Sequence, residues 1–228
     1  MNFVHTIGLI ASKDLRLEFR SWRSLAAMLA LSIAIIFAFA FTLGSRLMAA
    51  TDPKNLVPAV LWVTLVFAAL VGFQNSFALE RERDALSGLL LGPADHSAIY
   101  LGKLIANFIS VVVLEIAIVP LAAVFFGVDL FGVAGNLAVV MLLHTFGLCA
   151  VGTFLGVLVS RLRRGEALLA ILLLPLVIPI LISAGKTTLA VLAGRPLSEV
   201  SYWLVLASSF SAILTSISVL VFEYLVEE

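Results

Sequence analysis

Six long apolar runs constrain this chain more than any other feature of its sequence. Each run is close to the roughly 20 residues that a helix needs to cross a hydrocarbon core of about 30 Å. The runs are Leu25–Leu43, Leu56–Leu79, Ala98–Phe126, Asn136–Val159, Ala167–Ala184 and Ser201–Phe222. They lack the alternation, in segments of about ten residues, that a transmembrane β-barrel shows. The sequence therefore predicts an all-α integral membrane protein with six transmembrane helices.

The composition supports this fold class. The 228-residue chain is 62% hydrophobic and 12% charged, whereas soluble domains are about half apolar and a quarter charged. Its formal net charge is zero, so we expect no nucleic-acid partner. Cys149 is the single cysteine, which excludes a disulfide framework and a cysteine zinc site. With short loops between the runs, residues 1–228 are predicted to form one transmembrane domain with no metal site, no catalytic residues and no ATPase site of its own.

The distribution of Lys and Arg predicts the orientation in the membrane. Segments that would share one side carry Lys13, Arg16, Arg20, Arg23, Arg81, Arg83, Lys103, Arg161, Arg163 and Arg164. The opposite segments carry Arg46, Lys54, Lys186 and Arg195. Because the side richer in Lys and Arg is usually cytoplasmic, both termini are expected in the cytoplasm.

Residues 1–23 are predicted to form an amphipathic helix on the cytoplasmic leaflet. One side of its helical wheel carries Phe3, Val4, Ile7, Ala11, Leu15, Phe19 and Trp22, and the other carries His5, Lys13, Arg16, Arg20 and Arg23. Asp14 and Glu18 do not fit, because they fall towards the apolar side. We expect them to face another protein segment or a partner, although a plain membrane-surface anchor remains the alternative.

Two polar residues interrupt the apolar runs and are candidate site residues. Glu115 lies near the middle of the third run, and His144 lies at a comparable depth in the fourth. An ionisable group inside a membrane is costly and marks a functional hypothesis by default. The sequence favours a structural polar bridge between these two residues, with haem or metal ligation by His144 as the alternative.

Prolines and glycines predict local features of the spans. Pro120, Pro175 and Pro179 are expected to interrupt spans three and five. Gly147, Gly152 and Gly156 give span four a small-residue spacing suited to close helix packing.

The stretch SAGKTT at Ser183–Thr188 imitates the end of a phosphate-binding loop. Ile180 occupies the position of the first glycine of that motif, so we reject nucleotide binding there. A short outer helix or re-entrant turn between Gly185 and Gly194 is expected instead.

Between spans two and three the chain concentrates its charge. Glu80, Arg81, Glu82, Arg83 and Asp84 follow one another, and the leucines Leu86, Leu89 and Leu90 and then Pro93 come after them. Gly92 and Pro93 can end a helix here. We interpret residues 80–96 as a cytoplasmic coupling segment whose helix docks into a groove of a cytoplasmic partner. A solvated loop with salt bridges is the alternative.

This stretch carries a family resemblance. FALERERDALSGLLLGPADHSAIYLGKL, at Phe77–Leu104, resembles the segment after the second span in the haem exporter protein B (CcmB) family, the permease-like subunit of a cytochrome c maturation ABC complex. KDLRLEFR, at Lys13–Arg20, is similar to the family's amphipathic start. The length, the six spans and the short loops also fit this family.

The resemblance implies an ABC-2-like permease fold in the bacterial inner membrane. It implies a cytoplasmic ATPase subunit that binds ATP, a haem-handling membrane subunit, a small membrane subunit and an outer-side haem chaperone. Haem would be cargo of the complex, with no cofactor bound firmly by this chain. An ABC-2 permease for a lipid, polysaccharide or drug is the main alternative, and an intramembrane enzyme, active without an ATPase, is a more distant one.

Overall fold

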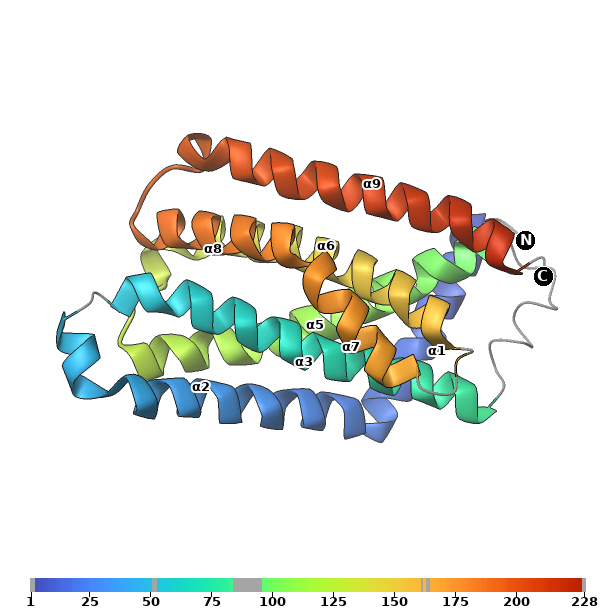
Figure 1. The fold of residues 1–228 in the computed structure, drawn as a ribbon, viewed down its shortest axis with the longest axis horizontal. Coiled ribbons are helices and arrows are strands. Elements are labelled where there is room, and N and C mark those ends of the chain that lie inside the picture. Colours follow the sequence, from blue (N-terminus) through green and yellow to red (C-terminus); the bar gives the residue numbers. More distant parts are fainter. Residues whose placement is uncertain (1–2, 51–52, 84–95, 161, 163–164, 227–228) are drawn as a thin grey trace.

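The computed structural model describes residues 3–50, 53–83, 96–160, 162 and 165–226, and these form a bundle of helices (Figure 1). The described residues include no β-strand. The long helices are α1 (Phe3–Ser21), α2 (Arg23–Ala50), α3 (Pro53–Arg83), α5 (His96–Phe126), α6 (Ala134–Ser160), α7 (Gly165–Leu176), α8 (Ile178–Leu192) and α9 (Ser201–Val226). Two short 3-10 helices, η1 (Phe131–Val133) and η2 (Leu197–Val200), precede α6 and α9.

The helices confirm the predicted multi-pass membrane fold. Apolar stretches of membrane-spanning length occur at Arg23–Thr42, Lys54–Phe77, Ser97–Phe126, Phe131–Val159 and Leu197–Val221. The helices α7 and α8 form a sixth span if this bent pair is counted as one. Within the bundle, 72% of the α3 span and 67% of the α6 span is buried, against 22% for α2 and 17% for α9. Therefore α3 and α6 form the centre, and α2 and α9 lie at its edges (Figure 1).

The fifth span is broken, as its prolines predict, but the break comes earlier than the expected turn. Helices α7 and α8 meet at an angle of 53° around Val177. Pro175 lies inside α7 and Pro179 in the first turn of α8, so two backbone donors are missing near the bend. Of the short outer helix or re-entrant turn expected between Gly185 and Gly194, the structure shows a helix as far as Leu192, but it is the second half of α8 and not a separate element.

Pro120 does not interrupt its helix. Helix α5 runs from His96 to Phe126 with Pro120 inside it, and the whole stretch forms one candidate span. A single proline removes one hydrogen bond, which the rest of a long, packed helix can tolerate. Two prolines four residues apart at the α7–α8 junction have the larger effect.

The glycines of α6 allow the close packing that their spacing predicts. A Cβ atom added at Gly152 would lie 2.0 Å from the Phe73 ring, and one added at Gly156 would lie 2.0 Å from the Phe77 ring. At Gly147 an added Cβ would lie 2.3 Å from Ser211 Oγ. The rings of α3 thus rest directly on the α6 backbone, and α9 approaches α6 in the same way.

Replacing Gly152 by valine is expected to destabilise the bundle by about 1–3 kcal/mol, the usual cost of overpacking a filled core. The added methyl groups would force the Phe73 ring away from α6. Thermal unfolding in detergent measures the effect, with Gly132→Ala as a control, because an added Cβ at Gly132 meets nothing within 4 Å. Equal melting temperatures for the two variants would contradict the close packing of α3 on α6.

Candidate functional site

Helix α1 is held against α5 by both apolar and polar contacts. Ile10 packs on Gly102, where an added Cβ would lie 2.8 Å from the isoleucine side chain. One turn further along α1, Asp14 Oδ2 lies 3.4 Å from Nζ of Lys103, the residue after Gly102. Ser110 Oγ donates a hydrogen bond to Glu18 Oε2 at 2.8 Å. We call this set of interactions the α1–α5 contact.

The α1–α5 contact explains the two acidic residues that did not fit an amphipathic surface helix. Asp14 and Glu18 face α5, which confirms that they contact another protein segment. The Lys103 side chain is only 3% exposed, and its ammonium group also lies 5.8 Å from the centre of the Phe77 ring. Burial raises the pKa of the Glu18 carboxyl, and the hydrogen bond from Ser110 opposes that rise. The placement of α1 on a membrane leaflet stays a prediction.

Glu115 and His144 do not pair with each other in this structure. The hydroxyl of Thr145 on α6 donates a hydrogen bond to Glu115 Oε1 on α5. The predicted polar bridge between spans three and four therefore exists, but Thr145 supplies it in place of His144. Neighbouring residues on a helix point about 100° apart, so His144 faces another helix when Thr145 faces α5.

His144 belongs to a separate buried cluster around α8. Its Nδ1 lies 2.7 Å from the Val140 carbonyl oxygen, and its Nε2 lies 2.8 Å from Ser183 Oγ. The Trp62 ring packs edge-on against the imidazole, with 5.5 Å between ring centres. The Trp62 indole also donates a hydrogen bond to Thr188 Oγ1 at 2.9 Å. These contacts join α8 to α6 and α3, and both nitrogens of His144 are used within the protein.

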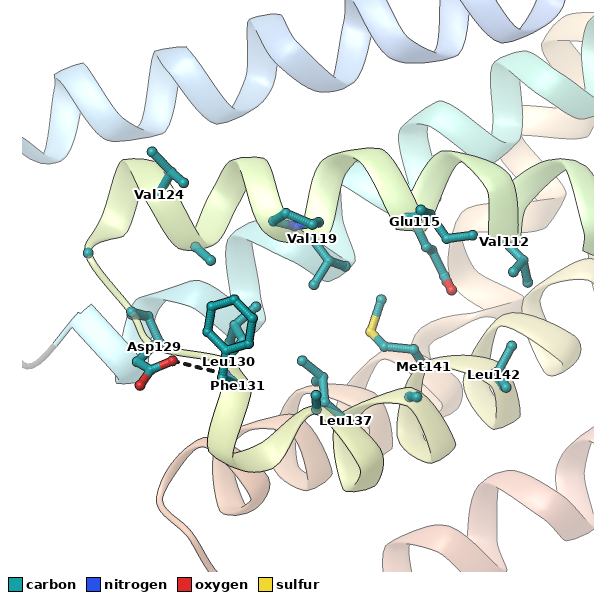
Figure 2. Close-up of a pocket in the computed structure, with 17 residues that line it drawn as sticks. Val112, Glu115, Val119, Val124, Asp129, Leu130, Phe131, Leu137, Met141 and Leu142 are labelled. Atoms are coloured by element: carbon teal, nitrogen blue, oxygen red, sulfur yellow. Dashed lines mark hydrogen bonds between the residues drawn. The ribbon is translucent and has the colours of Figure 1, made fainter.

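An apolar groove of about 660 Å³ lies between α5 and α6. Figure 2 shows Glu115, Met141 and Leu142 near one end, and Asp129 and Phe131 near the other, beside the connection from α5 to α6. Apart from the two acidic residues, the lining side chains are hydrophobic or glycine. The outer edges of the groove are open, since Ile116 is 71% exposed and Val124 is 79% exposed.

The coupling segment is described only at its two ends, Glu80–Arg83 and His96. Glu80, Arg81, Glu82 and Arg83 continue α3 as its last turn, with no break after the apolar span. Asp84, Leu86, Leu89, Leu90 and Pro93 lie outside the described residues. The helical start agrees with the docking-helix interpretation, which stays a prediction. Among the described residues, no three His, Cys, Asp or Glu side chains are placed to hold a metal ion.

Comparison with known proteins decides the family. A sequence model of the CcmB protein family matches residues 5–225, which is nearly the whole chain. The chain belongs to the CcmB family. The match includes the α1–α5 contact, the coupling segment, the groove and the broken span, so all of these features lie within the family's own domain.

Curated members of the CcmB family are similar to this chain over most of their length. "Heme exporter protein B" of Pseudomonas aeruginosa is 28% identical over 217 residues, which cover 94% of this chain and 95% of that protein. The protein of the same name from Rhodobacter capsulatus is 29% identical over 177 residues, covering 78% of this chain and 79% of that protein. The Haemophilus influenzae protein is 26% identical over 180 residues, covering 78% of each.

Sequence reasoning missed several residues that the structure brings together. Lys103 was assigned only to the cytoplasmic charge set, although its ammonium group pairs with Asp14. The misfit of Asp14 on its helical wheel was a signal that a basic partner should be sought. Thr145, Trp62 and Thr188 gave no such signal, because single hydroxyl and indole groups in apolar runs are common and become informative only once their partners are known.

Proposed function

We propose that this chain is the membrane permease subunit of an ABC-type haem exporter complex that serves cytochrome c biogenesis. The match to the CcmB family over residues 5–225 carries this proposal. Relatives named "Heme exporter protein B" support haem as the cargo of the complex. The partners would be a cytoplasmic ATPase subunit, a haem-handling membrane subunit, a small membrane subunit and an outer-side haem chaperone, in the bacterial inner membrane.

In this proposal, the separate ATPase subunit binds ATP. The movement of that subunit is transmitted to this chain through residues 80–96. The last turn of α3 holds Glu80–Arg83 and continues directly from the span, so a push on this turn moves α3 as a rigid rod. Helix α3 packs against α2, α5, α6 and α8 in the bundle. The α1–α5 contact would keep α1 attached to the same moving group of helices.

We further propose that ATP hydrolysis drives release of the haem-loaded chaperone, with no passage of haem along His144. Both ring nitrogens of His144 are engaged, by the Val140 carbonyl and by Ser183. Ligation of haem iron would require one of these contacts to break; if the Ser183 contact broke, α8 would lose one polar contact with α6. The arrangement supports a structural role for His144.

Complementation tests the proposed function. In a bacterium that lacks its own heme exporter protein B, this chain is expected to restore assembly of c-type cytochromes, measured as covalent haem staining. The Pseudomonas aeruginosa relative serves as the positive control. An ATPase subunit and a haem-handling membrane subunit are expected to co-purify with the chain. Normal membrane insertion with no cytochrome c assembly would instead favour an ABC-2 permease for another cargo.

Topology can be tested independently with single cysteines in a Cys149→Ala background. Cysteines at Pro53 and at Gly194, which follows the end of α8 at Leu192, are expected to react with an impermeant reagent from outside, and cysteines at Gly92 and Gly165 only from the cytoplasm. The expectation rests on the Lys and Arg distribution. Outside labelling at position 92 would rule out the docking of a cytoplasmic ATPase at this segment.

A further inference from the structure

We propose that the groove between α5 and α6 is a binding site for one phospholipid with an amine head group, such as phosphatidylethanolamine. The acyl chain would lie along the groove towards Glu115, and the ammonium group would lie beside Asp129. The lipid would come from the leaflet on the Asp129 side, which the Lys and Arg distribution makes the outer one. The proposal goes beyond the exporter function and does not depend on it.

The groove is about as long as one leaflet is thick. Its lining begins at Val112, and from there to the end of α5 at Phe126 there are 14 residues, or about 21 Å of helix. Half of a hydrocarbon core of about 30 Å is about 15 Å. The groove is therefore long enough to run from the middle region of the membrane to its surface at the α5–α6 connection, as an acyl chain does.

The shape of the groove suits a flexible chain. Its outer edges are open, where Ile116 is 71% exposed and Val124 is 79% exposed. A flexible hydrocarbon chain can fill such a space and remain in contact with the surrounding lipid.

The charges in the lining select the head group. Asp129 and Glu115 are the ionisable residues among the 17 lining residues, and both are acidic. Asp129 is exposed at the mouth, where its Oδ1 accepts a hydrogen bond from the Phe131 backbone amide at 2.9 Å. A head group with an ammonium ion complements this carboxylate, whereas the net negative charge of phosphatidylglycerol is repelled. The two propionates of haem would face the same repulsion.

Glu115 lies near the inner end of the site, with Val112 one turn earlier in α5. Thr145 holds its carboxyl at the boundary of the apolar lining, as Figure 2 shows for Glu115 beside Val112. Covering a carboxyl group with methylene groups is costly, so the end of an acyl chain is expected to stop there. The site thus has a carboxyl group near each end and is apolar between them.

Native mass spectrometry of the full-length protein tests this proposal. The protein is reconstituted in bilayers with equal amounts of phosphatidylethanolamine and phosphatidylglycerol and is then extracted in mild detergent. We expect one retained lipid, with phosphatidylethanolamine exceeding phosphatidylglycerol about two- to fivefold, as a single exposed charge pair provides. Equal retention of the two lipids would overturn the assignment of the head group.

Three variants separate the parts of the site. Asp129→Asn keeps the acceptor for the Phe131 amide and removes the charge, so the ratio of the two lipids should fall to about one. Ala138→Phe fills the groove and should abolish the retained lipid. Val139→Phe is the matched control, because Val139 is 51% exposed and does not line the groove.

Other occupants give distinguishable results. If Ala138→Phe retained as much lipid as Val139→Phe, the lipid would be bound elsewhere and the proposal would fail. If Ala138→Phe instead released a membrane partner from the co-purified complex, the groove would be a protein interface. A haem absorbance that Ala138→Phe removes would identify a haem site and would likewise overturn the proposal.

Discussion

Replacing Asp14 by asparagine is expected to lower the free energy of unfolding by about 1.5–3 kcal/mol, the usual contribution of a hydrogen bond to a charged group. The substitution keeps the shape of the side chain and places the buried Lys103 ammonium against a neutral amide. Lys103 Nζ lies 3.4 Å from Asp14 Oδ2, and its side chain is 3% exposed. Titration of the purified protein with a denaturing detergent measures this loss of stability.

Replacing the other partner, Lys103, should lower the free energy of unfolding by less than Asp14→Asn does. In Lys103→Met, the Asp14 carboxylate keeps Lys13, whose Nζ lies 3.0 Å from Oδ1. The double variant Asp14→Leu with Lys103→Met should approach the stability of the unchanged protein, since an apolar pair can replace a buried ion pair. If Asp14→Asn were neutral, or if the double variant were the least stable of the three, the ion pair would not hold α1 on α5.

The sequence predicted the spans well because a membrane restricts the choices. A hydrocarbon core satisfies no backbone hydrogen bonds, so an apolar run of about 20 residues has few alternatives to a helix. The first span, predicted at Leu25–Leu43, corresponds to the apolar stretch Arg23–Thr42 in the structure. The glycine spacing of α6 was equally informative. Because glycine has no side chain, it predicts that a neighbouring helix packs close to the α6 backbone, whichever helix that is.

The partners of polar residues could not be predicted in the same way. Glu115 was expected to meet His144 because both lie at a comparable depth, but depth does not determine which side of a helix faces which neighbour. In the structure, Glu115 is hydrogen-bonded to Thr145, one residue further along α6 than His144, and His144 is hydrogen-bonded to Ser183 on α8. The groove between α5 and α6 was missed for the same reason, because it is formed by side chains from two helices whose relative rotation the sequence does not specify.

The largest functional effect is expected from Leu89→Asp in the coupling segment. If Leu89 fills an apolar cleft in the ATPase subunit, a carboxylate there is buried without a partner at a cost of about 3–5 kcal/mol. The affinity between the two subunits should then fall by about two to four orders of magnitude, so that the ATPase subunit is lost on purification. Cytochrome c yield should fall with it, while the amount of the variant in the membrane stays normal.

Reversing both Arg81 and Arg83 to glutamate tests the charges separately from the apolar anchor. Charges at the rim of an interface mainly determine the association rate and the register, so we expect a weaker loss of binding than for Leu89→Asp. Arg81→Lys with Arg83→Lys is the control, because it keeps the charge on the last turn of α3. Since that turn continues the span without a break, a partner held in the wrong register would still bind but would push α3 less effectively. Partly retained ATPase binding with reduced cytochrome c yield is therefore the expected result. Full binding with full yield in both the Leu89 and the arginine variants would show that residues 80–96 are an ordinary solvated loop.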